Sequence, residues 1–335
     1  MIAARRTVRL VGALLGAAAM LGCATACAGS TAARPAARAT PPASPSPSRY
    51  VETEAAAPYT PHCDGPALIA HRGETGTGAN LPENTWQAEL AAAAEGATYL
   101  NMDVRWTSDG VPVGLHDPTV NRTTSETRPN TAISHLTAQQ YVALDARRYA
   151  GDTRSGRVDP NVHPDSLAEV LTEVAPTGKP IVLQMEADPY VPSEVGTGST
   201  AQRDFANLAQ VIQGSGYAAR VIVAGWTLAD LRAFHAVAPN VGLASLVETI
   251  GTKNLPTARQ ILATGARILY VDYRGLTAAE VAAWRAAGLK VWAWTPAARG
   301  QWQRLRGDGV DAIATNWSRA YLQWAPVPCS ASSSE

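Results

Sequence analysis

Two histidines, His71 and His116, lie in a short stretch that also carries an arginine and several carboxylates. Cleavage of a phosphodiester needs a base for the attacking oxygen, an acid for the departing oxygen, and positive charge for the phosphoryl oxygens. Histidine suits either proton-transfer role because its ordinary pKa is about 6.5. Arg72, directly after His71, offers a planar guanidinium that can donate two hydrogen bonds to phosphate. The stretch therefore indicates phosphodiester chemistry.

Carboxylates in the chain also predict a site for a divalent cation. Asp103 and Glu186 offer the hard oxygen ligands that calcium and magnesium prefer. The cysteines and histidines form no cluster with the spacing of a zinc site. We therefore expect an oxygen-bound divalent ion.

Each motif by itself also has a purely structural interpretation. Asp109-Gly110 lies between two apolar runs and is typical of a hairpin turn. His116 and Asp117 precede a proline and could simply end a strand. A single His-Arg-Gly triplet is a weak signal. The occurrence of all these pieces in one order is what favours a catalytic site.

That order resembles the pattern of the glycerophosphodiester phosphodiesterase family, which runs HRG, a PENT-like segment, ExD, a TxDG turn and HD. The corresponding pieces here are His71-Arg72-Gly73, Pro82-Glu83-Asn84-Thr85, Asn101-Met102-Asp103, Thr107-Ser108-Asp109-Gly110 and His116-Asp117. The resemblance is dense from His71 to Thr124 and weaker over the rest of the domain.

The resemblance implies a barrel enzyme that uses a divalent ion and two histidines to hydrolyse glycerophosphodiesters to glycerol 3-phosphate and an alcohol. It makes His71 and His116 the acid/base pair, Arg72 the phosphate clamp, and Asp103 and Glu186 the metal ligands.

Two more residues are expected at the site through the same resemblance. Glu83 matches a family position near the phosphate or the metal. Trp294, with Thr295, matches the family's WT pair and is expected to form a wall of the substrate mouth, although barrel packing is the alternative.

Three positions depart from the family pattern. Asn101 replaces a glutamate that ligates metal, Asp188 stands where a lysine is usual, and Asn316 replaces an aspartate near the end of the domain. The first two changes restore the number of carboxylates, so we expect Asn101 or Asp188 to assist in holding the ion. A flexible shell of roughly six to eight oxygens favours calcium over magnesium. The alternative is that Asp188 is a solvated loop residue.

Short apolar runs that alternate with helical patterns predict a single (β/α)8 TIM barrel over 62–330. The eight parallel strands are expected at 67–70, 99–104, 181–185, 221–224, 241–246, 268–271, 290–294 and 312–315. An extra hairpin strand follows the second one, at 111–115, and ends at His116. Helices are expected at 85–95, 167–175, 201–213, 228–237, 256–263, 278–287 and 301–305.

Chemistry in such barrels lies at the carboxyl ends of the strands. Seven polar or aromatic residues are predicted there: His71, Asp103, Glu186, Trp226, Asp272, Thr295 and Asn316. Asn101 and Asp103 are two residues apart in a strand, so their side chains should point to one site.

The amino-terminal residues 1–28 are typical of an export signal, with arginines before the apolar run 10–21 and small residues after it. Cleavage after Ala26 or Ala28 would release a soluble protein, whereas Cys23 or Cys27 could be acylated as a lipoprotein, which we favour slightly. Residues 29–61 are rich in Ala, Pro, Ser and Thr and predict a disordered tether. We therefore expect an extracellular protein, secreted or anchored to the outer face of the cell membrane.

Composition and cysteine placement limit the partners. Cys63 and Cys329 flank the barrel, which in an exported chain predicts a disulfide. The 28 basic residues balance the 28 acidic ones, so nucleic acid is not expected as a partner. Membrane contact is expected only through a lipid anchor, and the protein is expected to be a monomer.

Three functions are compatible with these patterns. The first is an exported hydrolase of glycerophosphodiesters, lysophospholipids or glycerol-phosphate polymers. The second is a cell-surface binding protein that kept the barrel and lost turnover. The third is a related lipid phosphodiesterase that forms a cyclic phosphate. The two histidines favour the first.

Overall fold

The computed structural model describes residues 65–76, 81–147, 158–186, 199–248 and 255–325. The export signal, the tether, Cys63, Cys329 and Asp188 lie outside these residues. Among the helices described, none combines the length and apolar character that a bilayer crossing requires.

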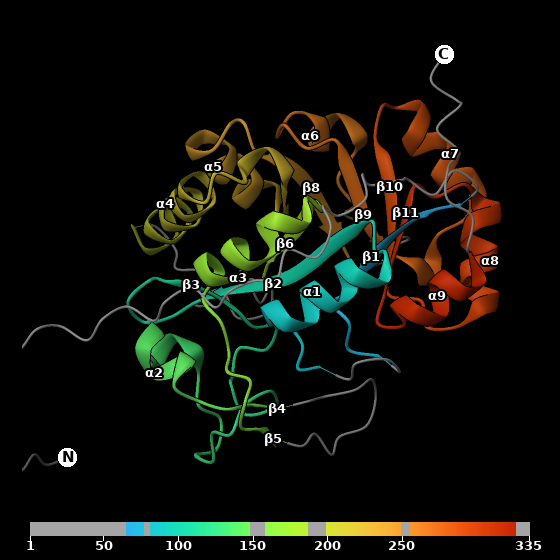
Figure 1. Cartoon of the computed structure of the whole chain (residues 1–335). Coiled ribbons are helices and arrows are strands. Elements are labelled where there is room, and N and C mark those ends of the chain that lie inside the picture. Colours follow the sequence, from blue (N-terminus) through green and yellow to red (C-terminus); the bar gives the residue numbers. More distant parts are fainter. Residues whose placement is uncertain (1–64, 77–80, 148–157, 187–198, 249–254, 326–335) are drawn as a thin grey trace, which may run out of the picture. The chain divides into compact units, whose positions relative to one another are not determined.

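Parallel strands form a closed barrel in the described part of the chain (Figure 1). Around the ring the order is β1, β11, β10, β9, β8, β7, β6 and β2, and β2 pairs back onto β1. The strands are β1 (Ala67–Ala70), β2 (Tyr99–Trp106), β6 (Ile181–Met185), β7 (Val221–Gly225), β8 (Gly242–Val247), β9 (Ile268–Asp272), β10 (Lys290–Trp294) and β11 (Ala312–Thr315). The predicted TIM barrel is confirmed.

The extra strand is also confirmed, although it is shorter than expected. β3 (Pro112–Gly114) pairs antiparallel with the far end of β2, outside the ring. The turn between them needs Gly110, whose φ is 79° and whose added Cβ would lie 2.8 Å from Arg203 Nε. This hairpin brings His116 back beside the end of β2.

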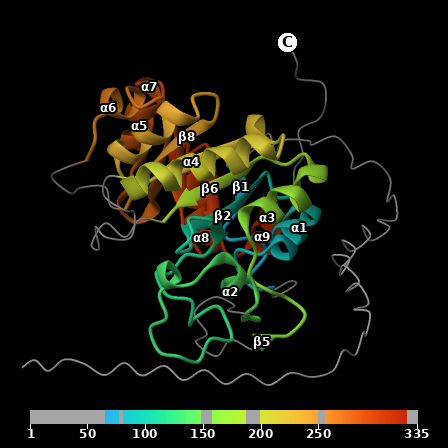
Figure 2. The same cartoon turned by 90° about the vertical axis from the view of Figure 1, so that its left-hand side faces the viewer.

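Helices surround the barrel (Figures 1 and 2). They are α1 (Trp86–Glu95), α3 (Leu167–Val174), α4 (Ser199–Gly214), α5 (Leu228–Val237), α6 (Ala258–Leu262), α7 (Ala278–Ala286), α8 (Arg299–Asp308) and α9 (Ser318–Trp324). Threonine or serine caps start several of them, for example Thr85 before α1 and Ser166 before α3. Helix α9 was not predicted from the sequence.

The barrel has two apolar regions because successive strand residues point to opposite sides. Outward residues such as Leu100, Met102 and Leu183 pack beneath the helices. Inward residues such as Ile69, Val182 and Trp292 fill the lumen. The polar residues of the carboxyl ends lie beyond this inner packing.

An insertion after β3 was also not predicted. It contains α2 (Ala138–Val142) and the strand pair β4 (Ala146–Arg147) and β5 (Val158–Asp159). Its own apolar cluster includes Leu115 and Tyr141, and the Tyr141 hydroxyl donates to the carbonyl of Gly114 at 2.7 Å. The insertion is thereby attached to β3, and its labels α2 and β5 lie below the barrel in Figure 2.

Candidate active site

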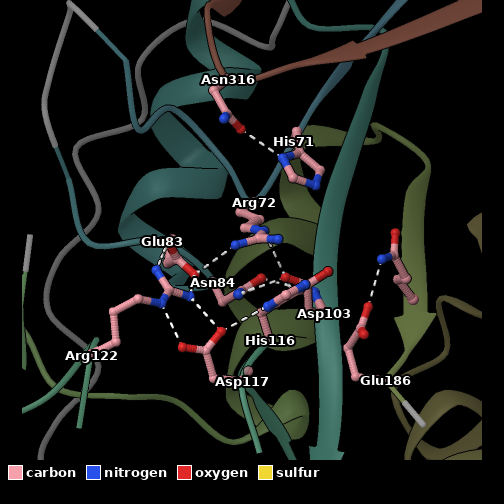
Figure 3. Close-up of polar contacts among 12 residues, drawn as sticks. His71, Arg72, Glu83, Asn84, Asp103, His116, Asp117, Arg122, Glu186 and Asn316 are labelled. Atoms are coloured by element: carbon pink, nitrogen blue, oxygen red, sulfur yellow. Dashed lines mark hydrogen bonds and ion pairs between the residues drawn. The ribbon is translucent and has the colours of Figure 1, made fainter. Parts of the chain in front are cut away.

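Residues from separate strand ends converge in one place (Figure 3). His71 follows β1, Asp103 lies on β2, and His116 comes two residues after β3. Glu186 follows β6 and Asn316 follows β11. The convergence predicted from the strand ends is therefore present for these residues.

The turn after β1 aims Arg72 into the site. Arg72 has a φ of 63° and Gly73 a φ of 85°, so the chain reverses immediately after His71. A Cβ at Gly73 would lie 2.6 Å from the Ala88 Cβ, so only glycine fits against α1. The Arg72 backbone N–H donates to Asn101 Oδ1 at 3.3 Å. This local geometry explains why the third residue of the HRG triplet is glycine.

Asp103 is held by the PENT-like segment. Asn84, with a φ of 59°, donates from Nδ2 to Asp103 Oδ2 at 3.0 Å and accepts the Asp103 backbone N–H at 2.8 Å. Arg72 Nε lies 2.9 Å from the same Oδ2, at an angle that makes an ion pair without a hydrogen bond. Asp103 is completely buried, and its Oδ1 has no partner within the described ranges of the chain.

Alternating charges connect Arg72 to His116 (Figure 3). Arg72 donates to Glu83 at 3.1 Å, and Arg122 donates to both Glu83 oxygens at 2.7 and 2.8 Å. Arg122 also donates to Asp117 at 2.6 and 3.0 Å. Asp117 in turn accepts from His116 Nδ1 at 2.8 Å.

Arg122 was missed by the sequence analysis. Its signal was weak, because the only hint was an arginine five residues after Asp117 in the densest part of the motif region. Arg122 binds Asp117 on one side and Glu83 on the other, and Glu83 is 39 residues away in the chain. The tertiary structure alone brings these groups together.

Both histidines use Nδ1 for a fixed hydrogen bond. His71 Nδ1 donates to the amide oxygen of Asn316 at 2.6 Å, and His116 Nδ1 donates to Asp117. An amide or carboxylate oxygen can only accept, so Nδ1 carries the proton in each ring. Each Nε2 is therefore left for proton transfer.

The two histidines have pKa values that are shifted in opposite directions. Burial, followed by the charge of Arg72, lowers the pKa of His71 to about 4. Burial and Arg72 also act to lower the pKa of His116, but the bond to Asp117 and the charges of Asp103 and Glu186 outweigh them and raise it. Opposite shifts in one site are typical of an acid and base pair.

The carboxylates Asp103 and Glu186 interact electrostatically. Burial, with the charge of Asp103, raises the pKa of Glu186. Burial acts to raise the pKa of Asp103 as well, but Arg72 outweighs it and lowers the value. The unpartnered Oδ1 of Asp103 and the raised pKa of Glu186 fit a cation shared by both groups.

Asn101, which was expected to assist in holding the ion, already makes hydrogen bonds to the backbone. Asn101 donates from Nδ2 to the carbonyl of Val182 at 3.1 Å, and its Oδ1 accepts from Arg72 N–H. Its amide is thus already engaged by backbone. Within the described residues, no group of three or more His, Cys, Asp or Glu side chains is arranged to hold a metal ion.

Two tryptophans stand at the mouth of the barrel. Trp226, directly after β7, and Trp294 pack edge to face with ring centres 5.9 Å apart, and both are half-buried. This placement suits the predicted wall. Asp272 lies at the carboxyl end of β9, as expected, and its carboxylate pairs with Arg274 and caps the turn that follows.

Most of the chain matches the sequence pattern of one known family. Residues 71–319 match the model of the Glycerophosphoryl diester phosphodiesterase family. The chain belongs to this family. The matched segment spans both histidines, both candidate metal carboxylates and every strand of the barrel except β1.

Individual relatives agree with this membership. Over 110 residues the chain is 38% identical to Glycerophosphodiester phosphodiesterase 1 of Rattus norvegicus, covering 33% of this chain and 30% of the relative. It thus spans about a third of that protein's length. Over 250 residues it is 26% identical to Glycerophosphodiester phosphodiesterase of Caldanaerobacter subterraneus subsp. tengcongensis, covering 74% and 93% of the two chains.

Solved structures share the fold. A phosphodiesterase from Oleispira antarctica, in complex with the product sn-glycerol-3-phosphate, has a TM-score of 0.63 at 19% identity and covers 78% of this chain and 98% of its own. A glycerophosphodiester phosphodiesterase from Parabacteroides distasonis has a TM-score of 0.62 at 16% identity, with the same coverage. These similarities support the barrel assignment.

Proposed function

We propose that this protein hydrolyses glycerophosphodiesters outside the cytoplasm, releasing glycerol 3-phosphate and an alcohol. The observation that carries the proposal is the pair of histidines, whose free Nε2 atoms and opposite pKa shifts accompany Arg72 at one strand-end site. Family membership supports the reaction class. The apolar run at 10–21 supports the export.

Each residue then has one role. His71 is neutral near pH 7 and accepts a proton from the attacking water. The raised pKa of His116 favours its charged form, which donates a proton to the departing oxygen. Arg72 binds phosphoryl oxygens, and its position is fixed by Glu83 and Asp103.

We further propose that Asp103 and Glu186 hold a divalent ion, calcium in preference to magnesium, with help from Asn101 or Asp188. The unpartnered Asp103 Oδ1 supports this assignment. When bound, the ion would supply positive charge for the phosphoryl oxygens. Asn101 would have to share its oxygen with Arg72 N–H.

A second candidate is a barrel that binds phosphodiesters without turnover. The engaged amide of Asn101, in place of a glutamate ligand, is the observation that favours it. The test is release of products from glycerophosphocholine and from a lysophospholipid, with added calcium, with added magnesium, and with a chelator. We expect hydrolysis that the chelator abolishes. Tight substrate binding with no product under any of these conditions would support the second candidate instead.

A further inference from the structure

Tyr270 carries a hydroxyl that the site described above does not use. Its strand, β9, stands four places from β2 in both directions around the ring, so the two strands face each other across the lumen. Tyr270 belongs to the inward cluster, whereas Leu269 and Val271 pack outward beneath the helices. The Tyr270 side chain therefore points across the lumen, toward the wall that carries Asp103.

The strand register places Tyr270 just beneath the rim. Barrels of this kind are filled by layers of four inward side chains from alternate strands. Following the pairings around the ring puts one such layer at Asn101, Ala224, Tyr270 and Ala314. The two alanines leave room at the barrel axis for the tyrosine ring. The next layers toward the rim contain His71 and then Asp103.

The hydroxyl of Tyr270 has no hydrogen-bond partner among the residues that the structure describes, although the side chain is completely buried. Buried polar groups in proteins nearly always have a partner, so an exception in a site points to a ligand. Burial, together with the charge of Asp103, raises the pKa of Tyr270. The group is therefore a neutral hydroxyl that can donate at any physiological pH.

Asp103 Oδ1, on the opposite wall, also lacks a partner in the described part of the chain. Within the described residues, an acceptor for the Tyr270 hydroxyl and a partner for Asp103 Oδ1 are thus both missing from the same lumen. A phosphate ester with a cation would satisfy both, because its oxygens accept hydrogen bonds and bind cations.

We propose that the Tyr270 hydroxyl donates a hydrogen bond to a phosphoryl oxygen of the bound phosphodiester and so forms the floor of the phosphate site. This inference rests on the proposed function, because it takes a phosphate ester as the ligand. Arg72 binds the phosphoryl group from the rim, and Tyr270 binds it from the inner end. A neutral donor adds orientation there without adding a further charge.

The test compares Tyr270→Phe with a matched variant, Tyr321→Phe. Both tyrosines are buried, but the Tyr321 hydroxyl donates to the carbonyl of Pro66 at 2.7 Å, at the opposite end of β1 from the site. Binding of sn-glycerol 3-phosphate is measured by calorimetry, and thermal unfolding is measured without ligand. Turnover of glycerophosphocholine by the unmodified protein is measured alongside.

We expect Tyr270→Phe to raise the Kd for sn-glycerol 3-phosphate roughly 10- to 100-fold, as for a lost hydrogen bond to a charged group. Its unfolding temperature should stay the same or rise, because it removes an unpartnered buried hydroxyl. Tyr321→Phe should lower the unfolding temperature and leave the Kd unchanged. If Tyr270 had only a structural role, Tyr270→Phe would lower the unfolding temperature and leave the Kd unchanged.

The outcomes separate this inference from the proposed function. If the unmodified protein turns over substrate and the Kd of Tyr270→Phe is unchanged, the inference is overturned and the proposed function stands. An ordered water as the only partner of the Tyr270 hydroxyl would give this result. Weakened binding in the variant supports the inference even if the unmodified protein shows no turnover. An unmodified protein that neither binds sn-glycerol 3-phosphate nor hydrolyses the substrate overturns both.

Discussion

At the scale of single residues, Arg122 is notable because it binds two carboxylates, Glu83 and Asp117, that contact different residues of the site. Glu83 orients Arg72, and Asp117 orients His116. The burial of Arg122 acts to lower its pKa, but these two carboxylates outweigh burial and raise it. One side chain therefore couples the position of Arg72, the proposed phosphate clamp, to that of His116.

Arg122→Ala should lower kcat/KM for glycerophosphocholine by roughly 100-fold, because displacement of positioned groups by about 1 Å can cost that much. Steady-state kinetics provide the measurement. The matched control is Arg128→Ala, since Arg128 pairs with Glu126 in the same insertion but its side chain is 71% exposed. Equal rates for the two variants would remove the positioning role from Arg122.

The opposite pKa shifts of the histidines predict a bell-shaped dependence of kcat/KM on pH. Activity should fall below about pH 4, where His71 becomes protonated, and should fall again above the raised pKa of His116. Asn316→Asp places a negative charge on His71 Nδ1 and so should move the acid limb to higher pH. Asn130→Asp, in an exposed turn, should leave both limbs in place. An acid limb that does not move in Asn316→Asp would contradict the role of His71 as base.

At the scale of elements, the carboxyl end of each strand supplies the chemistry and the following turn aims it. The β2–β3 hairpin is the clearest case, because the Leu115 backbone N–H donates to the Asp103 carbonyl at 3.0 Å and so brings His116 to the rim. Helix α1 contributes from the other side, since it packs against Gly73 and carries the cap residue Thr85. The site thus depends on how α1 is anchored.

Asp165 anchors the start of α1, and this contact should depend on pH. Its Oδ2 accepts the Trp86 backbone N–H at 2.9 Å, and burial raises the pKa of the carboxyl from 3.8 to about 7. Because the folded-state pKa is above the ordinary value, folding takes up a proton, and the free energy of unfolding falls as pH rises from 3.8 to about 7.

Asp165→Asn keeps an acceptor for Trp86 N–H and removes the titration, so the fall in stability over that pH range should become smaller. Urea unfolding at several pH values measures it. Asp230→Asn, at a half-buried position in α5, serves as the control. A pH dependence in Asp165→Asn identical to that of the unmodified protein would mean that other groups cause it.

At the scale of the whole molecule, the two cysteines that flank the barrel belong to residues outside the described part of the chain. We predict that Cys63 and Cys329 form a disulfide in the exported protein, because it would join the two ends of the domain. Mass spectrometry of the unreduced, thiol-alkylated protein measures it. Two alkylated cysteines at these positions would contradict the prediction, and Cys63→Ser with Cys329→Ser should lower the unfolding temperature.

The sequence alone determined the barrel and much of the site. Parallel strands buried on both sides must be apolar runs, so each strand of the ring could be located to within about two residues. The Asp109-Gly110 turn predicted the hairpin because its backbone conformation needs glycine. The motif order placed His71, Asp103 and His116 at strand ends, since chemistry in this fold is confined to that edge.

Only the tertiary structure decided which side chains meet across the ring. Arg122 reaches Glu83 from a different loop, and Asn101 turns its amide to the backbone of Arg72 and Val182. Tyr270 faces the strand of Asp103 because three strands lie between β9 and β2 on either side of the closed ring. The pKa shifts of the histidines likewise depend on burial and on charges from distant segments. Local sequence cannot report these, because distances between strands are set by closure of the barrel.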